Sequence, residues 1–308
     1  MLNRRRDGRS NRLVSRRLVG RATHVTPLPR SLLLLLLMAT MIPNGCVGRS
    51  EQRASERPIR WIATTSVQDT GLLEGLVAML EKRTGLRIEA IAVGSGQAFE
   101  LARRGDADLL MTHAPTLERE FLREGIATRE RMLMSNDFVF VGPPEDPAGV
   151  RGMTDPVAML QKIANSAATF VSRADRSGTH LCELQLREAN GIVLPPERLI
   201  ETGLGQAPSL RVASERGAYT LTDRATWTVH ARSLELELLG GGDERLANRY
   251  RLFEIGPEHR PAGDDPRVAQ LFDALNDSAT AEFIDTFGVA TYGAALFRSR
   301  STDEATSD

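Results

Sequence analysis

Cysteine is scarce in this chain of 308 residues, which holds only Cys46 and Cys182. Two cysteines exclude a disulfide framework, and Cys182 is expected to be a small buried apolar residue. The sequence also lacks the Gly-x-Ser-x-Gly turn that presents the nucleophile of α/β-hydrolases. Histidines and carboxylates do not recur at the spacing of a metal site. These absences argue against a hydrolase and against a metalloenzyme.

The chain has an apolar run at residues 32–42, which is too short to span a bilayer comfortably. Residues 1–30 carry nine arginines against one acid, Asp7, and small residues follow the apolar run. A basic leader, a short apolar run and small residues in this order are typical of a secretory signal. We therefore expect residues 1–45 to be a signal peptide and the chain to be exported.

Cys46 follows Gly45 just after the apolar run, where a bacterial lipoprotein carries its acylated cysteine. Pro43 and Asn44 stand where a lipoprotein usually has small aliphatic residues. Two outcomes stay open: a lipid anchor at Cys46 on the outside of the cell membrane, or simple cleavage that leaves a periplasmic protein. The polar residues 46–57 are expected to form a flexible tether.

Positive charge is scarce once this leader is removed. Residues 46–308 keep 30 basic and 39 acidic side chains, a net charge of about −9. A chain this acidic is not expected to bind nucleic acid or a membrane surface through bulk charge. Any anion that it binds must therefore be held by local, oriented donors.

Residues 172–180 contain the parts of such an anion site. An apolar strand is expected before them and an amphipathic helix after them. Arg173 supplies a fixed cation, Ser177 and Thr179 supply hydroxyls, and Gly178 lets the backbone turn close to a ligand. The first N–H groups of a helix lack partners and lie at the positive end of its dipole, so an oxyanion can bind there without a metal.

Other hydroxyl-bearing loops follow two more expected strands. Thr64, Thr65 and Ser66 end the first, and Ser95 lies in a Gly-Ser-Gly turn after the second. Such loops gather at the carboxyl ends of strands in open α/β sheets, where ligands bind. Simple N-capping of a helix at the first loop and a structural turn at the second stay open as alternatives. Thr220 lies in a further hydroxyl-rich turn.

Three features are expected to serve the fold around this site. His113 follows a third strand and is interpreted as a hydrogen-bonded structural histidine. Tyr219 is interpreted as a wall of the cleft. The apolar run at 138–141 suits a strand covered on both faces, which we expect to cross to a second lobe.

The order of these elements predicts two lobes and flanking segments. The expected divisions are residues 1–45, a signal peptide; 46–57, a tether; 58–140, the first part of lobe 1; 141–228, lobe 2; 229–298, the second part of lobe 1; and 299–308, a disordered tail.

From Trp61 to about Phe297 the chain resembles the tungstate-binding, TupA-type component of bacterial ABC transporters. Seven stretches carry the resemblance in the same order along the chain, which makes the signal specific. They are residues 64–66 with 68–69 (TTS, QD), 93–98 (VGSGQA), 104–108 (RGDAD), 113–115 (HAP), 136–139 (NDFV), 172–180 (SRADRSGTH) and 217–224 (GAYTLTDR).

The resemblance implies an α/β, two-lobe type II periplasmic-binding-protein fold. Each lobe is then a mixed sheet flanked by helices, with the ligand in the cleft between the lobes. The implied ligand is a bare tetrahedral oxyanion, tungstate or else molybdate, with no cofactor, no metal and no catalytic residue. The implied binding positions are Thr65, Ser95, Arg173, Thr179 and Thr220, with Thr64, Ser66 and Ser177 as near neighbours. The implied partner is the membrane permease of an ABC transporter, and we expect a monomer.

Other functions stay open as alternatives. Sulfate is smaller than tungstate, and phosphate at neutral pH can carry a proton that needs an acceptor; Asp175 is such an acceptor if it points into the cleft. An exported oxyanion-sensing domain would need the same site. An enzyme would use Ser66 or Ser177 as nucleophile and His113 or His180 as base, but the missing hydrolase turn argues against it.

Overall fold

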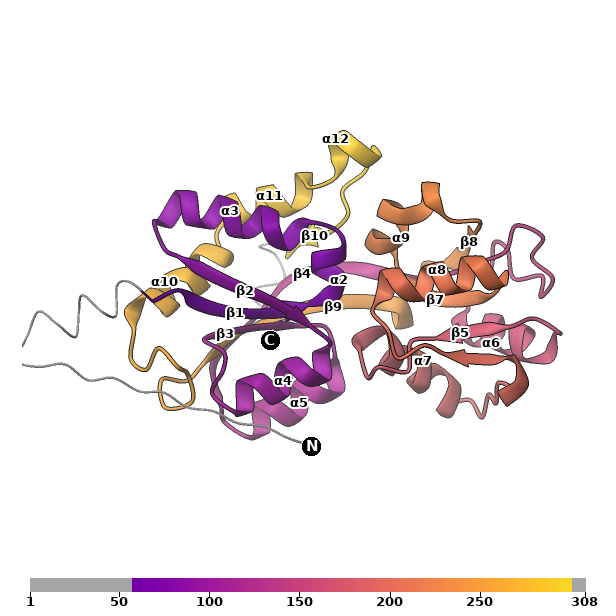
Figure 1. Cartoon of the computed structure of the whole chain (residues 1–308), viewed down its shortest axis with the longest axis horizontal. Coiled ribbons are helices and arrows are strands. Elements are labelled where there is room, and N and C mark those ends of the chain that lie inside the picture. The colour runs from indigo at the N-terminus through magenta and orange to yellow at the C-terminus, as the bar shows by residue number, and fades with distance from the viewer. Residues whose placement is uncertain (1–56, 301–308) are drawn as a thin grey trace, which may run out of the picture. The chain divides into compact units, whose positions relative to one another are not determined.

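The computed structural model describes residues 57–300. Its strands form one mixed sheet in two halves, and β4 (Ala127–Gly142) belongs to both (Figure 1). We call the half that holds the N-terminal strands lobe 1 and the other half lobe 2. The expected α/β, two-lobe architecture is therefore confirmed. The predicted signal peptide, Cys46 and residues 46–56 of the tether lie outside the described residues.

Lobe 1 is built on parallel strands. In sheet order they are β2 (Ile88–Val93), β1 (Ile59–Thr64) and β3 (Leu109–Thr112), followed by the antiparallel β9 (Ala247–Ile255) and the first part of β4. Parallel neighbours need a crossover connection, which is usually a helix. The helices α3 (Leu72–Thr84) and α4 (Ser95–Arg103) provide these crossovers, so the loops that follow β1 and β2 open at the same edge of the sheet.

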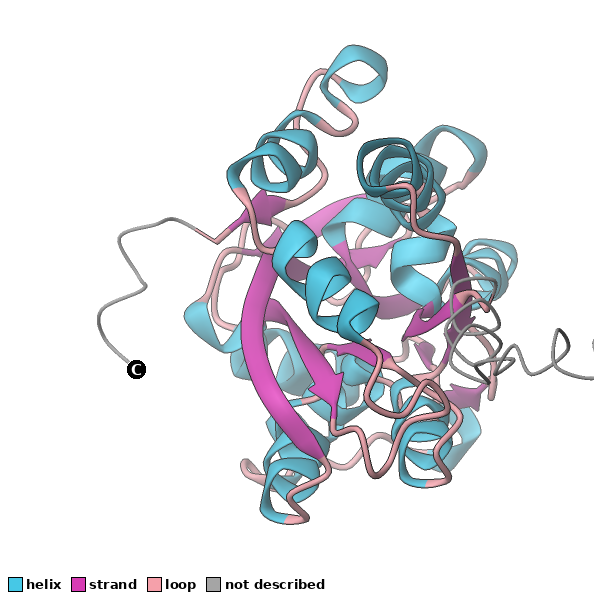
Figure 2. Ribbon diagram, turned by 90° about the vertical axis from the view of Figure 1, so that its left-hand side faces the viewer, coloured by secondary structure: helices cyan, strands magenta, loops and turns pink. Residues whose placement is uncertain are grey.

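Helices cover both faces of this half (Figures 1 and 2). On one face lie α3, α10 (Pro266–Leu275) and α11 (Ser278–Thr286); on the other lie α4 and α5 (Pro115–Arg123). Leu72, Leu76 and Leu80 recur at helical spacing along α3 and are fully buried against Trp61. On the opposite face the rings of Phe99 and Phe121 lie 5.1 Å apart. Two apolar layers therefore hold the strands rigidly.

Strand β4 is much longer than the predicted strand at 138–141. Its second part is that apolar run, and it pairs with β7 in lobe 2. Its first part, from Ala127, pairs with β9 and mixes charged and apolar residues, so it has no continuous apolar pattern. The expected crossing to a second lobe is present, and the strand that makes it begins 11 residues earlier than predicted.

Lobe 2 has five strands in the order β8 (Glu237–Gly241), β4, β7 (Tyr219–Asp223), β5 (Phe170–Ser172) and β6 (Leu199–Glu201). Its helices are α6 (Pro156–Asn165), α7 (Gly178–Glu188), α8 (Gln206–Arg216) and α9 (Arg224–His230). The remaining elements are α2 (Thr65–Asp69), α12 (Val289–Tyr292), β10 (Arg298–Ser299) and the 3-10 turns Pro196–Arg198, Ala231–Ser233 and Glu244–Leu246.

The return of the chain to lobe 1 comes later than expected. Residues 229–246 were assigned to lobe 1, but β8 pairs with the second part of β4, and Leu239 and Leu246 pack in the core of lobe 2. The chain re-enters lobe 1 only at β9. The sequence of residues 234–239 does not indicate which half of the sheet this strand joins, because that depends on its pairing with β4.

Three smaller expectations also change. Tyr219 is fully buried, and its hydroxyl accepts from the Ala148 N–H and donates to Asp146. It is therefore a core residue and not a wall of the cleft.

Ser299 is expected in the disordered tail, but it belongs to β10, which pairs with β4. Residues 301–308 lie outside the described residues. Cys182 is half-buried and packs against the lobe 2 core.

Between residues 57 and 300, none of the helices has the length and the apolar character needed to cross a bilayer.

Candidate functional site

Four of the predicted site residues lie where a strand ends and a helix begins. Thr64 is the last residue of β1, Ser95 is the first of α4, Arg173 follows β5, and Thr179 lies in the first turn of α7. Each of these four side chains is at most 2% exposed. The carboxyl ends of strands are where ligands bind in open α/β sheets, so the placement fits the prediction.

The N-terminus of α4 is open to a ligand. Its N-cap residue is Gly94, and no side chain caps the helix. By contrast, α6, α10 and α11 are capped by the aspartates Asp155, Asp265 and Asp277. Because the first N–H groups of a helix have no partner within it, the start of α4 leaves backbone donors available.

Ser95 adds an unusual feature to this helix start. Its side chain is fully buried, yet its hydroxyl has no hydrogen-bond partner in the part of the chain that the structure describes. An unsatisfied buried polar group costs about 1–3 kcal/mol, and native proteins leave few of them. An acceptor oxygen of a ligand would remove this cost, so the hydroxyl marks a place for one.

Arg173 is the buried cation of the site. Its Nε donates to the Leu204 carbonyl at 3.3 Å, and Nη1 donates to Gln206 Oε1 at 3.0 Å. Its Nη2 donates to Asp175 Oδ2 at 2.5 Å, which forms an ion pair. Nη2 carries two N–H groups and has this one acceptor, so a donor is left for another oxygen.

The loop from Arg173 to Ser177 turns sharply. Ala174 has φ of 50° and Arg176 has φ of 59°, in the left-handed region that non-glycine residues rarely adopt. The Ser177 N–H donates to Asp175 Oδ1, and the Ser177 hydroxyl accepts from the His180 N–H as the N-cap of α7. Both oxygens of Asp175 therefore have partners within the loop.

A second polar cluster joins β1 to β9. The Ser66 hydroxyl lies 3.2 Å from Thr64 Oγ1, 3.2 Å from the Tyr250 hydroxyl and 3.4 Å from His113 Nε2. His113 Nδ1 lies 2.7 Å from Asn248 Oδ1. Burial lowers the pKa of His113 to about 4, so the ring is neutral at pH 7. The interpretation of His113 as a hydrogen-bonded structural residue is confirmed.

Contacts between the lobes bring these loops together. A Cβ built on Gly178 of lobe 2 would stand 2.3 Å from the His113 carbonyl oxygen of lobe 1. A Cβ on Gly96, next to Ser95, would stand 3.8 Å from Arg176 Cβ. The Ala207 N–H at the start of α8 donates to Asp69 Oδ2 at 3.3 Å. The Ser95 and Arg173 loops therefore lie next to one another.

Two predicted residues differ from these. Thr220 is buried in β7, and its hydroxyl donates to the Val171 carbonyl at 2.8 Å, so its proton is used inside the sheet. Thr65 is half-buried as the first residue of α2. The Thr220 hydroxyl therefore has no proton left to donate to a ligand.

Gln206, Asn248 and Tyr250 were missed by the sequence analysis. Gln206 contacts Arg173, and the other two hold His113 and Ser66. Gln206 follows a glycine-rich turn, and the other two lie in a strand recognised only in part. No local motif in the sequence marks them, because their role depends on contacts with distant residues.

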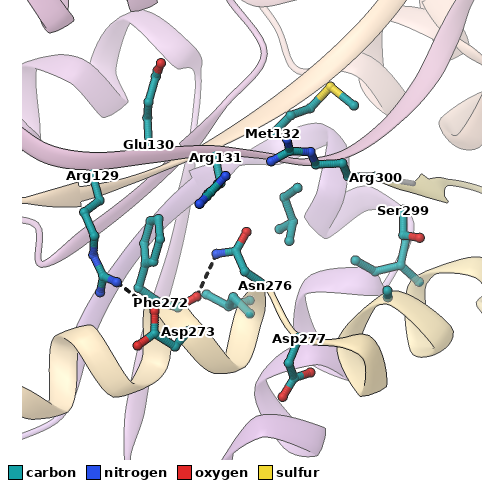
Figure 3. A pocket seen from close by; sticks show the side chains of 14 residues that line it. Arg129, Glu130, Arg131, Met132, Phe272, Asp273, Asn276, Asp277, Ser299 and Arg300 are labelled. Carbon is teal, nitrogen blue, oxygen red and sulfur yellow. Dashed lines mark hydrogen bonds and ion pairs between the residues drawn. The ribbon is translucent and has the colours of Figure 1, made fainter. Parts of the chain in front are cut away.

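The cavities of the described residues do not single out this site. One of about 250 Å³ lies beside it and is lined by His113 and Gly178, among others. A larger one of about 590 Å³ lies in lobe 1 between β4, α10 and α11 (Figure 3). In that cavity Arg129 is ion-paired with Asp273, and none of the predicted binding residues lines it.

The donor set suits an anion and not a cation. One guanidinium, several hydroxyls and the free N–H groups of α4 are donors, and an oxyanion accepts from all of them. Among residues 57–300 there is no group of three or more His, Cys, Asp or Glu side chains that could hold a metal ion.

Comparisons with known proteins agree with this arrangement. A profile of the PBP superfamily domain matches residues 50–263. The chain is 32% identical over 276 residues to the tungstate-binding protein TupA of Peptoclostridium acidaminophilum. The match covers 87% of this chain and 96% of that protein. It is 39% identical over 223 residues to a Haloferax volcanii protein that carries the name of an ABC transporter anion-binding protein; the match covers 71% of this chain and 65% of that relative.

Solved structures lead to the same family. The tungstate binding protein TupA from Desulfovibrio alaskensis matches with a TM-score of 0.68 and 37% identity, covering 80% of this chain and 100% of that one. The chain therefore belongs to the PBP superfamily and, within it, to the TupA-type substrate-binding proteins of ABC transporters, which have the type II fold.

Proposed function

We propose that this chain captures tungstate outside the cytoplasm and delivers it to the membrane permease of an ABC transporter. The observation that carries the proposal is the buried, unpartnered hydroxyl of Ser95 at the uncapped start of α4. Its neighbour Gly96 lies against the loop that holds Arg173. The names of the TupA relatives support tungstate as the anion.

Arg173 is proposed to make the strongest contact with the anion. Its guanidinium presents a planar fork of N–H donors that suits two oxygens. Ser95 and the first N–H groups of α4 would donate from lobe 1. The Thr179 hydroxyl donates to Gln206, so Thr179 would donate from lobe 2 through its backbone N–H in the first turn of α7. Thr65 is kept as a further position, with Thr64, Ser66 and Ser177 as near neighbours and Thr220 as a support of strand β5.

Selectivity against phosphate is proposed to follow from Asp175. A protonated phosphate needs an acceptor, and Asp175 is the acidic side chain of the Arg173 loop. Its Oδ2 accepts from Arg173 and its Oδ1 accepts from the Ser177 N–H. Because both oxygens serve the loop, a fully deprotonated dianion such as tungstate or molybdate is the better ligand. The preference for tungstate over molybdate rests on the relatives alone.

The function needs no catalysis, and we propose that the chain has none. Ser66 and His113 do lie near each other, but burial lowers the pKa of His113 to about 4, which makes it a weak base, and the Ser66 hydroxyl is shared with Thr64 and Tyr250. His180 contacts Ser177 through its backbone N–H and not through its ring. Neither pair has the geometry of a nucleophile with its base.

We also propose that the chain is exported as a monomer, with residues 1–45 as the signal peptide. The two fates of Cys46 differ in mass, because acylation adds fatty-acid chains. Mass spectrometry of the mature N-terminus from the native host would separate a lipid anchor from simple cleavage.

A competition among four anions tests the proposed function. The melting temperature of the protein would be measured with tungstate, molybdate, sulfate and phosphate at equal concentrations. A ligand stabilises the fold by mass action, by about 2.7 kcal/mol at 100 times its Kd. We expect tungstate and molybdate to raise the melting temperature well above the values with sulfate and phosphate. A larger shift with phosphate or sulfate, or no shift with any anion, would contradict the proposal.

A further inference from the structure

Gln206 is a fully buried amide that touches two of the proposed ligand-binding side chains. It is the first residue of α8 and is 0% exposed. Its Oε1 accepts from Thr179 Oγ1 at 2.8 Å and from Arg173 Nη1 at 3.0 Å. Its Nε2 donates to the Leu221 carbonyl of β7 at 3.3 Å. One amide therefore ties together the loop after β5, the first turn of α7 and strand β7.

The orientation of this amide is determined by its surroundings. A rotated amide would turn its NH2 group toward the guanidinium N–H groups, donor against donor, and its oxygen toward the Leu221 carbonyl, acceptor against acceptor. Only the observed orientation pairs every group. The Gln206 oxygen is thus held at one place, and Arg173 and Thr179 are held relative to it.

Gln206 differs from Asp175, which also holds Arg173. Asp175 is an anion, so it offsets part of the positive charge that would attract an oxyanion. Gln206 is neutral, so it fixes the guanidinium and leaves the charge unchanged. A site for a dianion benefits from the second kind of support, because fixed donors cost no reorganisation when the ligand binds.

We propose that Gln206 is a positioning residue that holds the Arg173 guanidinium and the first turn of α7 in the arrangement that binds the oxyanion. The inference rests on the proposed function. Gln206 Oε1 accepts from Arg173 Nη1 and from Thr179 Oγ1, and Arg173 Nη1 also donates to Thr179 Oγ1 at 3.4 Å. Without the Gln206 oxygen, the guanidinium would lose the neutral acceptor that fixes it, and its donors would have to be ordered again when the anion binds.

The test is isothermal titration of tungstate and sulfate into the wild type and two variants. Gln206→Met keeps the size of the side chain and removes the acceptor. It should weaken tungstate binding about 10- to 100-fold, as expected for lost hydrogen bonds to a charged group. It should weaken sulfate binding by a similar factor, because both anions would use the same guanidinium. Gln206→Glu keeps the acceptor and adds a negative charge, so it should weaken both anions by similar factors.

A coupling measurement separates positioning from a general structural role. Gln206→Met would be combined with Thr179→Val, and the loss of tungstate affinity compared with the two single losses. A positioning role predicts that the double loss is smaller than the sum of the single losses. The matched control is Gln185→Met, which changes an exposed glutamine of α7. This variant should bind tungstate as the wild type does. Circular dichroism would confirm that each variant is folded.

Two outcomes overturn the inference. One is that Gln206→Met binds tungstate and sulfate as the wild type does. The other is that the affinity losses of the two substitutions add without coupling. If the wild type itself binds none of the anions, the proposed function fails and this inference fails with it, so the two failures are told apart by the wild-type titration.

Discussion

Gly178 at the start of α7 lies directly against His113 on the other lobe. A Cβ on Gly178 would stand 2.3 Å from the His113 carbonyl oxygen and 2.5 Å from Nδ1. Real Cβ atoms do not approach other atoms so closely. The two lobes therefore meet at a point where only a glycine fits, beside the proposed anion site.

Replacing Gly178 with alanine should disturb this contact. Overpacking of a tight site costs about 1–3 kcal/mol, so Gly178→Ala should lower the free energy of unfolding by about that amount or weaken tungstate binding by keeping the lobes apart. Gly96→Ala is the control for stability, because the nearest atom to its added Cβ is 3.8 Å away. Urea unfolding and titration calorimetry measure both effects. Equal behaviour of the two variants would show that the Gly178 contact does not matter.

Ser95→Ala should separate ligand binding from stability. The hydroxyl has no partner among residues 57–300, so its removal should leave the free energy of unfolding without ligand unchanged or slightly higher. A hydrogen bond to a charged ligand contributes about 1.5–3 kcal/mol, so tungstate affinity should fall about 10- to 100-fold. Thermal melts without ligand and titration calorimetry give the two numbers. Unchanged affinity would remove Ser95 from the site.

Glu118 predicts a pH dependence of stability. Its Oε1 accepts from the Thr112 hydroxyl and the Ala114 N–H, and burial raises its pKa from 4.5 to about 7. Between these two pH values the folded protein holds a proton on Glu118 that the unfolded chain has released. The contribution of Glu118 to stability is therefore present below pH 4.5 and is lost as the pH rises toward 7, by up to about 3 kcal/mol.

Glu118→Gln provides the comparison. The variant keeps an acceptor for both donors but does not titrate. The difference in unfolding free energy, wild type minus variant, should fall as the pH rises from 4.5 to 7.5. Urea unfolding at several pH values measures this difference. Parallel curves for the two proteins would show that the pKa of Glu118 is not raised.

Much of the fold could be predicted because its signals are local. The apolar strands of lobe 1 each stand before a loop and an amphipathic helix, and the structure has them in that order. The first part of β4 could not be predicted, because three charged residues at 129–131 precede three apolar residues at 132–134, which gives no period-two alternation. Strand β8 was assigned to the wrong lobe because pairing, and not composition, decides which sheet a strand joins.

The candidate site shows the same division. Ser95, Arg173 and Thr179 carry visible signals, namely a cation or a hydroxyl in a loop between a strand and a helix. Gln206 and Tyr250 carry none, since their contacts join segments far apart in the sequence. Thr220 shows that a hydroxyl-rich turn does not by itself predict a ligand contact, because its hydroxyl donates to the Val171 carbonyl of the neighbouring strand.

Titration of tungstate into the wild type and into Arg173 variants tests the central claim most directly. Arg131→Ala, which removes an exposed arginine of the lobe 1 cavity in Figure 3, is the control for lost positive charge. Truncating one partner of a buried charge pair costs about 2–5 kcal/mol. We predict that the wild type and Arg131→Ala bind tungstate alike, that Arg173→Lys binds more weakly, and that Arg173→Ala, folded by circular dichroism, does not bind measurably. Near-native tungstate affinity in Arg173→Ala would contradict the account.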